Sequence, residues 1–181
     1  MFDCKRLFVF AAFLLMTVAG ASTTASAQSR IALVIGQGAY PSGALPTAVN
    51  DAGLVAQTLT SAGFEVVQGR DLESNDLRWV VRDFLDKVQA AGPDAAIMVY
   101  LAGHGMQFEG ENYFVPVDAR IARDVDIPLE GFRLSDITRA LAAAPARVRI
   151  VVADMSREFP LPSTGQTIAA GLALVEPPEG F

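Results

Sequence analysis

The chemistry that this sequence could perform centres on its only histidine, His104, in the segment Ala-Gly-His-Gly after an apolar run. Imidazole is the usual general base near neutral pH. The glycines on either side, Gly103 and Gly105, remove side-chain bulk and allow unusual backbone torsions. We therefore expect a turn at 102–105 that projects the imidazole into open space at the edge of a sheet. A loop histidine without a role is the alternative.

A second candidate, Ser156, lies in the segment Asp154-Met-Ser-Arg157, which follows another apolar run. A serine hydroxyl becomes a nucleophile when a base, itself held by a third group, activates it. His104 could be that base, but the sequence assigns no third group. It also lacks the Gly-x-Ser-x-Gly pattern of the α/β-hydrolases. Taken alone, Ser156 is more typical of a loop or capping serine.

Several other kinds of site are excluded by composition and spacing. One cysteine and one histidine cannot form a disulfide or a Cys/His zinc site. Gly36-Gln-Gly38 is followed by Pro41 where a dinucleotide fingerprint needs its third glycine, and there is no P-loop. The formal net charge of −6 argues against nucleic-acid binding, which favours a basic stripe. We expect no metal, cofactor or nucleic-acid partner.

The first 27 residues have the pattern of a secretory signal peptide. Lys5 and Arg6 precede an apolar run at 7–21, and Ala25-Ser-Ala27 forms a small-residue cleavage site. The run is shorter than the ~20 residues of a spanning helix, although retention as a membrane anchor is the alternative. We expect residues 28–181 to be exported, periplasmic or secreted, with no stable membrane anchor.

The elements that must position these residues alternate between buried strands and amphipathic helices. Strands are expected at 31–35, 64–67, 95–101 and 148–153, helices at 47–62, 75–91 and 135–143, and a hairpin at 106–115. We expect Trp79, on the second helix, to pack against an edge of the core. This order predicts an α/β fold with a mostly parallel sheet and helices on both faces. Sites in such sheets lie at the carboxyl ends of strands, here after Gly36, Ala102 and near Asp154.

Three segments resemble the caspase/metacaspase family of cysteine peptidases, especially its bacterial branch. They are RIALVIGQGAY with LPTAVNDA, then VYLAGHGMQFEGENYFVPVDA, then RIVVADMSREFP. The resemblance covers residues 30–160 and implies a three-layer caspase-like sandwich over 28–181. Gln37 stands where bacterial members typically have asparagine.

The resemblance implies a Cys-His dyad, in which His104 matches the histidine and Ser156 takes the place of the cysteine. A thiol, with a pKa of ~8.5, reaches its anion readily, whereas a serine hydroxyl does not. We therefore expect a pseudopeptidase that binds peptides or partner proteins. The alternatives are an active endopeptidase that uses Ser156 with His104, and a truncated, non-functional product.

Two acids match the family's substrate pocket. Asp51 and Asp154 correspond to acidic positions that in metacaspases select Arg or Lys before the scissile bond, since carboxylates favour cationic side chains. The alternatives are helix-start capping for Asp51 and a strand-end turn for Asp154. The family's domain continues with a further strand beyond the segment that ends at Phe181. We therefore expect the C-terminal part of the domain to be missing and the open sheet edge to be a possible dimer interface.

Overall fold

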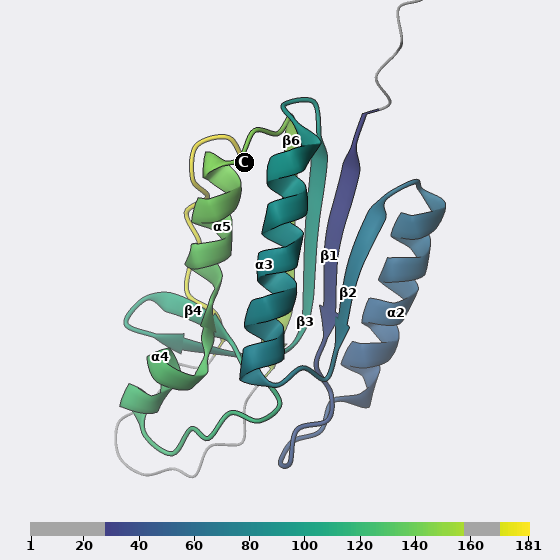
Figure 1. Cartoon of the computed structure of the whole chain (residues 1–181). Coiled ribbons are helices and arrows are strands. Elements are labelled where there is room, and N and C mark those ends of the chain that lie inside the picture. The colour runs from purple at the N-terminus through teal and green to yellow at the C-terminus, as the bar shows by residue number, and fades with distance from the viewer. Residues whose placement is uncertain (1–27, 158–170) are drawn as a thin grey trace, which may run out of the picture.

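The computed structural model describes residues 28–157 and 171–181, so the expected signal peptide lies outside it (Figure 1). Within these residues, strands and helices alternate along the chain. They are β1 (Arg30–Gly36), α2 (Pro46–Ser61), β2 (Glu65–Arg70), α3 (Ser74–Ala91), β3 (Ala96–Phe108), β4 (Glu111–Phe114), η1 (Asp124–Asp126), α4 (Ile127–Glu130), β5 (Phe132–Arg133), α5 (Leu134–Ala143) and β6 (Val148–Arg157).

The sheet is mostly parallel, as expected. Four strands run parallel in the order β2-β1-β3-β6. The far half of β3 leaves this arrangement and pairs antiparallel with β4, which pairs antiparallel with β5. In the part of the chain that the structure describes, β6 pairs with β3 alone.

Helices cover both faces of the sheet and make the three layers that the sequence predicts. In Figure 1, α2 lies on one face, and α3 and α5 lie on the other. Alternate residues of β1 divide between the two cores because successive strand side chains point to opposite faces. Leu33 and Ile35 pack with Phe84 of α3, whereas Val34 packs with Ala52 of α2.

All four expected strands are longer in the structure, and β3 and β6 extend furthest beyond their expected ends. The turn predicted at 102–105 is wrong, because β3 continues through it to Phe108, and β6 continues to Arg157. The three expected helices, α2, α3 and α5, begin and end within one residue of their expected positions, whereas η1 and α4 were not expected. Trp79 does not pack against the core, since it is 66% exposed.

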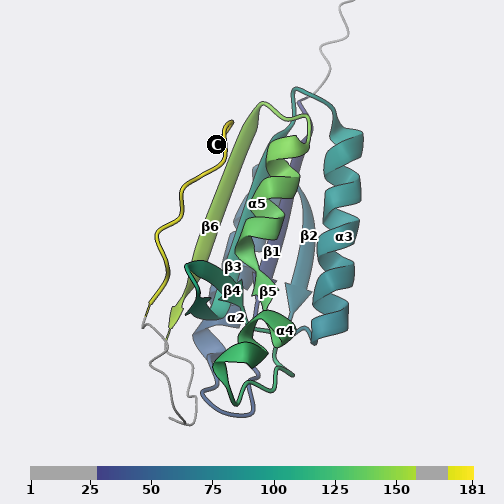
Figure 2. The same cartoon turned by 90° about the vertical axis from the view of Figure 1, so that its left-hand side faces the viewer.

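The outer strand β6 has an apolar face that the described residues leave open. Val148, Ile150 and Val152 alternate with core residues and remain 39%, 46% and 38% exposed. On the opposite face, Arg149 donates a hydrogen bond to the carbonyl of Gly180, and residues 171–181 run alongside β6 (Figure 2). None of the helices in the described ranges is long and apolar enough to cross a membrane.

Candidate active site

The pairing of β3 with β6 brings His104 and Ser156 together. Ala102 pairs with Asp154, and His104 then pairs with both Ser156 and Arg157, where the register shifts by a bulge. Neighbouring strands in a sheet lie ~4.8 Å apart. The two residues that the sequence singled out as base and nucleophile are therefore backbone neighbours on adjacent strands.

The imidazole of His104 is not in open space, contrary to expectation. His104 is 2% exposed, and the Nε2 atom of its ring lies 2.6 Å from the carbonyl oxygen of Gly43. The loop between β1 and α2, residues 37–45, folds over the ring. Gly43 has a φ of +70°, a torsion that glycine adopts without strain.

This contact determines which ring nitrogen carries the proton. A carbonyl oxygen can only accept a hydrogen bond, so Nε2 must donate. In the neutral imidazole Nδ1 is then the basic atom, and any proton taken from a nucleophile would go there. The carbonyl of Gly43 therefore orients the imidazole, as the third group of a catalytic triad would.

Tyr40 supports the same histidine from a second direction. Its ring meets the imidazole edge-on, with centroids 4.5 Å apart. Its hydroxyl accepts a hydrogen bond from the backbone N–H of His104 at 3.0 Å and donates one to the carbonyl of Val115 at 2.9 Å. Burial raises the pKa of Tyr40 above its ordinary value, although the bond from His104 opposes this. The hydroxyl thus keeps the proton that it donates.

The β1–α2 loop is itself anchored by two side chains. The fully buried Gln37 donates to the carbonyl of Leu72 at 2.7 Å and accepts from its N–H at 2.6 Å. One carboxylate oxygen of Asp71 accepts from the N–H groups of Gly38 and Ala39 at 2.7 and 2.8 Å. Burial alone would raise the pKa of Asp71, but these bonds outweigh it and lower the pKa.

The glycines beside His104 allow close approach. A β-carbon on Gly103 would lie 2.7 Å from the Tyr40 hydroxyl, and one on Gly105 would clash with the carbonyl of Met155 in β6. Neither glycine has a positive φ. The expected absence of bulk is confirmed, whereas the expected unusual torsions are wrong.

Asp51 and Asp154 lie near one end of the sheet on different elements. Asp154 is half-buried on β6 and pairs with Ala102 of β3. Ala102 pairs on its other side with Gly36 of β1. Asp51 is half-buried on α2, next to Ala52, which packs on Gly36. Two strand spacings, ~10 Å, separate Asp154 from Gly36. The two acids therefore lie in the same region of the molecule, at the carboxyl end of the parallel strands.

Comparison of the sequence with protein-family models assigns the chain to a family. The model of the caspase domain matches residues 29–175. The chain belongs to the caspase family. Its fold follows the expected caspase-like α/β architecture. No curated protein matches the sequence of this caspase domain.

Two supports of this caspase domain's histidine escaped the sequence reasoning. No pattern in the sequence indicates the role of the Gly43 carbonyl, because every residue has a backbone carbonyl. Tyr40 did stand in the first loop of the family pattern, but its distance of 64 residues from His104 hid the contact. The described ranges hold no cluster of three acidic, histidine or cysteine side chains suited to a metal ion.

Proposed function

We propose that this caspase domain binds peptide segments carrying Arg or Lys and does not cleave them. The observation that carries the proposal is that Ser156 pairs with His104 on the neighbouring strand. The resemblance of its segment to the family's motif implies that this serine stands in the place of the nucleophilic cysteine. A thiol ionises readily, whereas a hydroxyl needs a strongly activating base. In this proposal the histidine and its supports are kept, whereas a hydroxyl takes the place of the thiol that they would activate.

The preference for a basic side chain rests on Asp51 and Asp154. Both are half-buried at the carboxyl end of the sheet, where ligands of α/β folds bind. A carboxylate pair would attract a guanidinium or ammonium group through charge-assisted hydrogen bonds. Because a serine in place of a cysteine at position 156 leaves these acids unchanged, peptide binding would survive the loss of catalysis.

Binding is tested with fluorescein-labelled peptides whose central residue is Arg, Lys or Gln, measured by fluorescence anisotropy. We expect Arg and Lys peptides to bind the protein about tenfold more tightly than Gln peptides, which is ~1.4 kcal/mol. Asp51→Asn and Asp154→Asn should each remove most of this preference. Asp94→Asn is the matched control, because Asp94 is an exposed acid just before β3, at the opposite end of the sheet. Equal losses in all three variants would refute a specific acidic pocket.

An active serine endopeptidase is the second candidate. It is favoured by the β3–β6 register, which pairs His104 with Ser156, and by the Gly43 carbonyl, which orients the imidazole. Hydrolysis of fluorogenic Arg and Lys peptides separates the two functions. Cleavage by the unmodified protein that is lost in Ser156→Ala would establish the active enzyme and overturn the pseudopeptidase.

We also propose that the domain acts after export, in the periplasm or outside the cell. The support is the charged, apolar and small-residue order of residues 1–27. Cell fractionation followed by N-terminal sequencing tests this, and we expect the exported chain to begin at Gln28. A chain that remains intact in the membrane fraction would contradict it.

A second copy of the chain is a further proposed partner. The outer strand β6 carries three exposed apolar side chains, Val148, Ile150 and Val152, and among the described residues it pairs with β3 alone. A strand edge without a partner strand favours pairing between chains. Analytical ultracentrifugation should show a dimer that Ile150→Lys weakens, and an unmodified protein that stays monomeric at high concentration would refute it.

A further inference from the structure

A pocket lies beside the β1–α2 loop and has no role in the site described above. It measures about 290 Å³ and is lined by Tyr40, Pro41 and Ser42 on one side and by Val117 and residues 119–122 on the other. Ser42 immediately precedes Gly43, whose carbonyl holds the imidazole of His104. Whatever fills this pocket would therefore touch the segment that orients the histidine.

The walls of the pocket belong to a fixed apolar cluster. Tyr40 and Ile121 are 4% and 6% exposed, and they pack with Tyr113, Val115 and Ile127 in a core separate from those against the sheet. Val117 and Ala119 pack against the same cluster. The pocket thus has a rigid apolar base suited to an aliphatic group.

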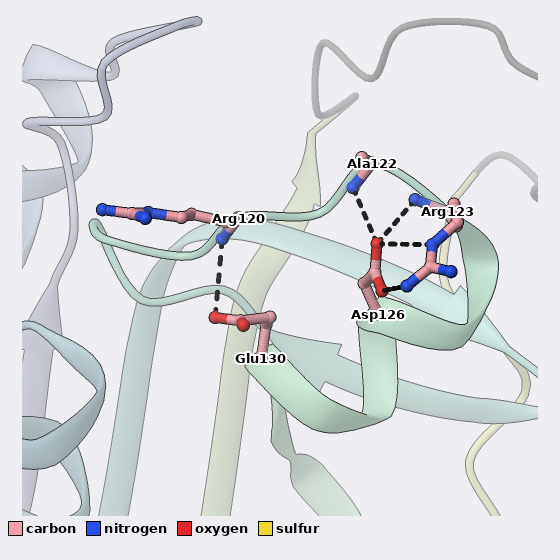
Figure 3. A network of polar contacts seen from close by, with 5 residues as sticks. All are labelled: Arg120, Ala122, Arg123, Asp126 and Glu130. Carbon is pink, nitrogen blue, oxygen red and sulfur yellow. Dashed lines mark hydrogen bonds and ion pairs between the residues drawn. The ribbon is translucent and has the colours of Figure 1, made fainter.

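Two acids, Asp126 and Glu130, hold the backbone of the rim in place (Figure 3). Asp126 accepts hydrogen bonds from the N–H groups of Ala122 and Arg123 at 3.2 and 2.9 Å, and pairs with the Arg123 guanidinium at 2.8 Å. The bond from Arg123 lowers the pKa of Asp126, so this carboxylate stays charged. Glu130 accepts from the N–H of Arg120 at 3.5 Å.

Arg120 is therefore the cation of this rim that no acid neutralises. In the described ranges its guanidinium forms no ion pair, in contrast to that of Arg123. Its side chain is exposed, and Figure 3 shows it extending away from the Arg123–Asp126 pair. An unpaired guanidinium beside an apolar base matches a ligand with a carboxylate next to an aliphatic group.

We propose that this pocket binds an acidic side chain, Asp or Glu, of a peptide segment. Arg120 pairs with the carboxylate, and the aliphatic carbons of the segment lie against Tyr40 and Ile121. The inference rests on the proposed function, because it assumes that peptides bind near His104. It adds a second determinant, so that a bound segment carries a basic residue and, at a fixed distance from it, an acidic one.

The test scans a single Asp through every flanking position of fluorescein-labelled nonapeptides, each matched by an Asn peptide. One series has Arg at its centre and a second has Gln. Binding is measured by fluorescence anisotropy on the unmodified protein, Arg120→Gln and Arg123→Gln. Arg123 is the matched control, because it is equally cationic, lies three residues away and is already paired. An exposed ion pair contributes up to ~1 kcal/mol, which corresponds to about fivefold in affinity.

We expect one position at which Asp binds about fivefold more tightly than Asn to the unmodified protein and to Arg123→Gln, but not to Arg120→Gln. If no Asp peptide binds more tightly than its Asn counterpart, or if the difference persists in Arg120→Gln, the proposed binding of an acidic side chain is wrong. Comparing the Arg series with the Gln series tests the proposed preference for a basic residue separately. If the Gln series matches the Arg series while the dependence on Arg120 persists, the basic preference fails and the acidic pocket stands.

Discussion

Replacing Tyr40 with Phe removes one oxygen atom and leaves two buried backbone groups without that partner. The hydroxyl accepts from the N–H of His104 and donates to the carbonyl of Val115, and both residues are at most 2% exposed. Leaving a buried polar group unsatisfied costs ~1–3 kcal/mol. Two such groups should therefore lower the free energy of unfolding by about 2–6 kcal/mol, although the ring itself still fits.

Urea denaturation measures this change directly. With an m-value of ~2 kcal/mol/M, the midpoint should fall by roughly 1–3 M. Tyr113→Phe is the matched control, because Tyr113 is equally buried and its ring, which the substitution keeps, lies under the guanidinium of Arg133 at 5.4 Å. It should cost ~1 kcal/mol or less. Since His104 is the only histidine, its imidazole NMR signals should also shift in Tyr40→Phe alone. Equal stability losses in both variants would refute the bridging role of Tyr40.

Two further predictions concern the elements around the histidine. Gly105→Ala should disrupt the β3–β6 pairing because its β-carbon would meet the carbonyl of Met155, whereas Gly53→Ala, in open space on α2, should stabilise the protein by ~1 kcal/mol. Thermal denaturation of both variants checks this, and similar melting temperatures would contradict it. Asp71→Asn should destabilise the protein at neutral pH but not in acid. Because the folded state lowers the pKa of Asp71, its contribution is present above the ordinary value of ~4 and disappears as the pH falls through the lowered value. Urea titrations at pH 7 and pH 3 check this, and an unchanged difference between the two proteins would contradict it.

The sequence predicted the strands and helices well because their apolar residues recur with strand and helix periods. Leu77, Val80, Val81 and Phe84 repeat at three- and four-residue steps, and all face the core. The period also places Trp79 on the outside, since it falls between Leu77 and Val80 on the opposite side of the helix. Its large apolar ring suggested burial, but the helical position decided the outcome.

The site was predictable only in part. The motif around His104 and the departure at Ser156 are local, so they could be found in the sequence, and the β3–β6 register makes them neighbours. The supports of the imidazole are not local. Gly43 lies 61 residues from His104 and acts through its backbone, which leaves no trace in residue type. The two glycines beside His104 suggested a turn, whereas their real role is to admit the neighbouring strand and Tyr40.

The central claim is that the site is assembled and that the nucleophile alone prevents catalysis. Cleavage of fluorogenic Arg and Lys peptides by Ser156→Cys, beside the unmodified protein, tests it most directly. We predict cleavage by Ser156→Cys alone, abolished by the additional substitution His104→Ala. Cleavage by the unmodified protein, or none by a folded Ser156→Cys variant, would contradict the account.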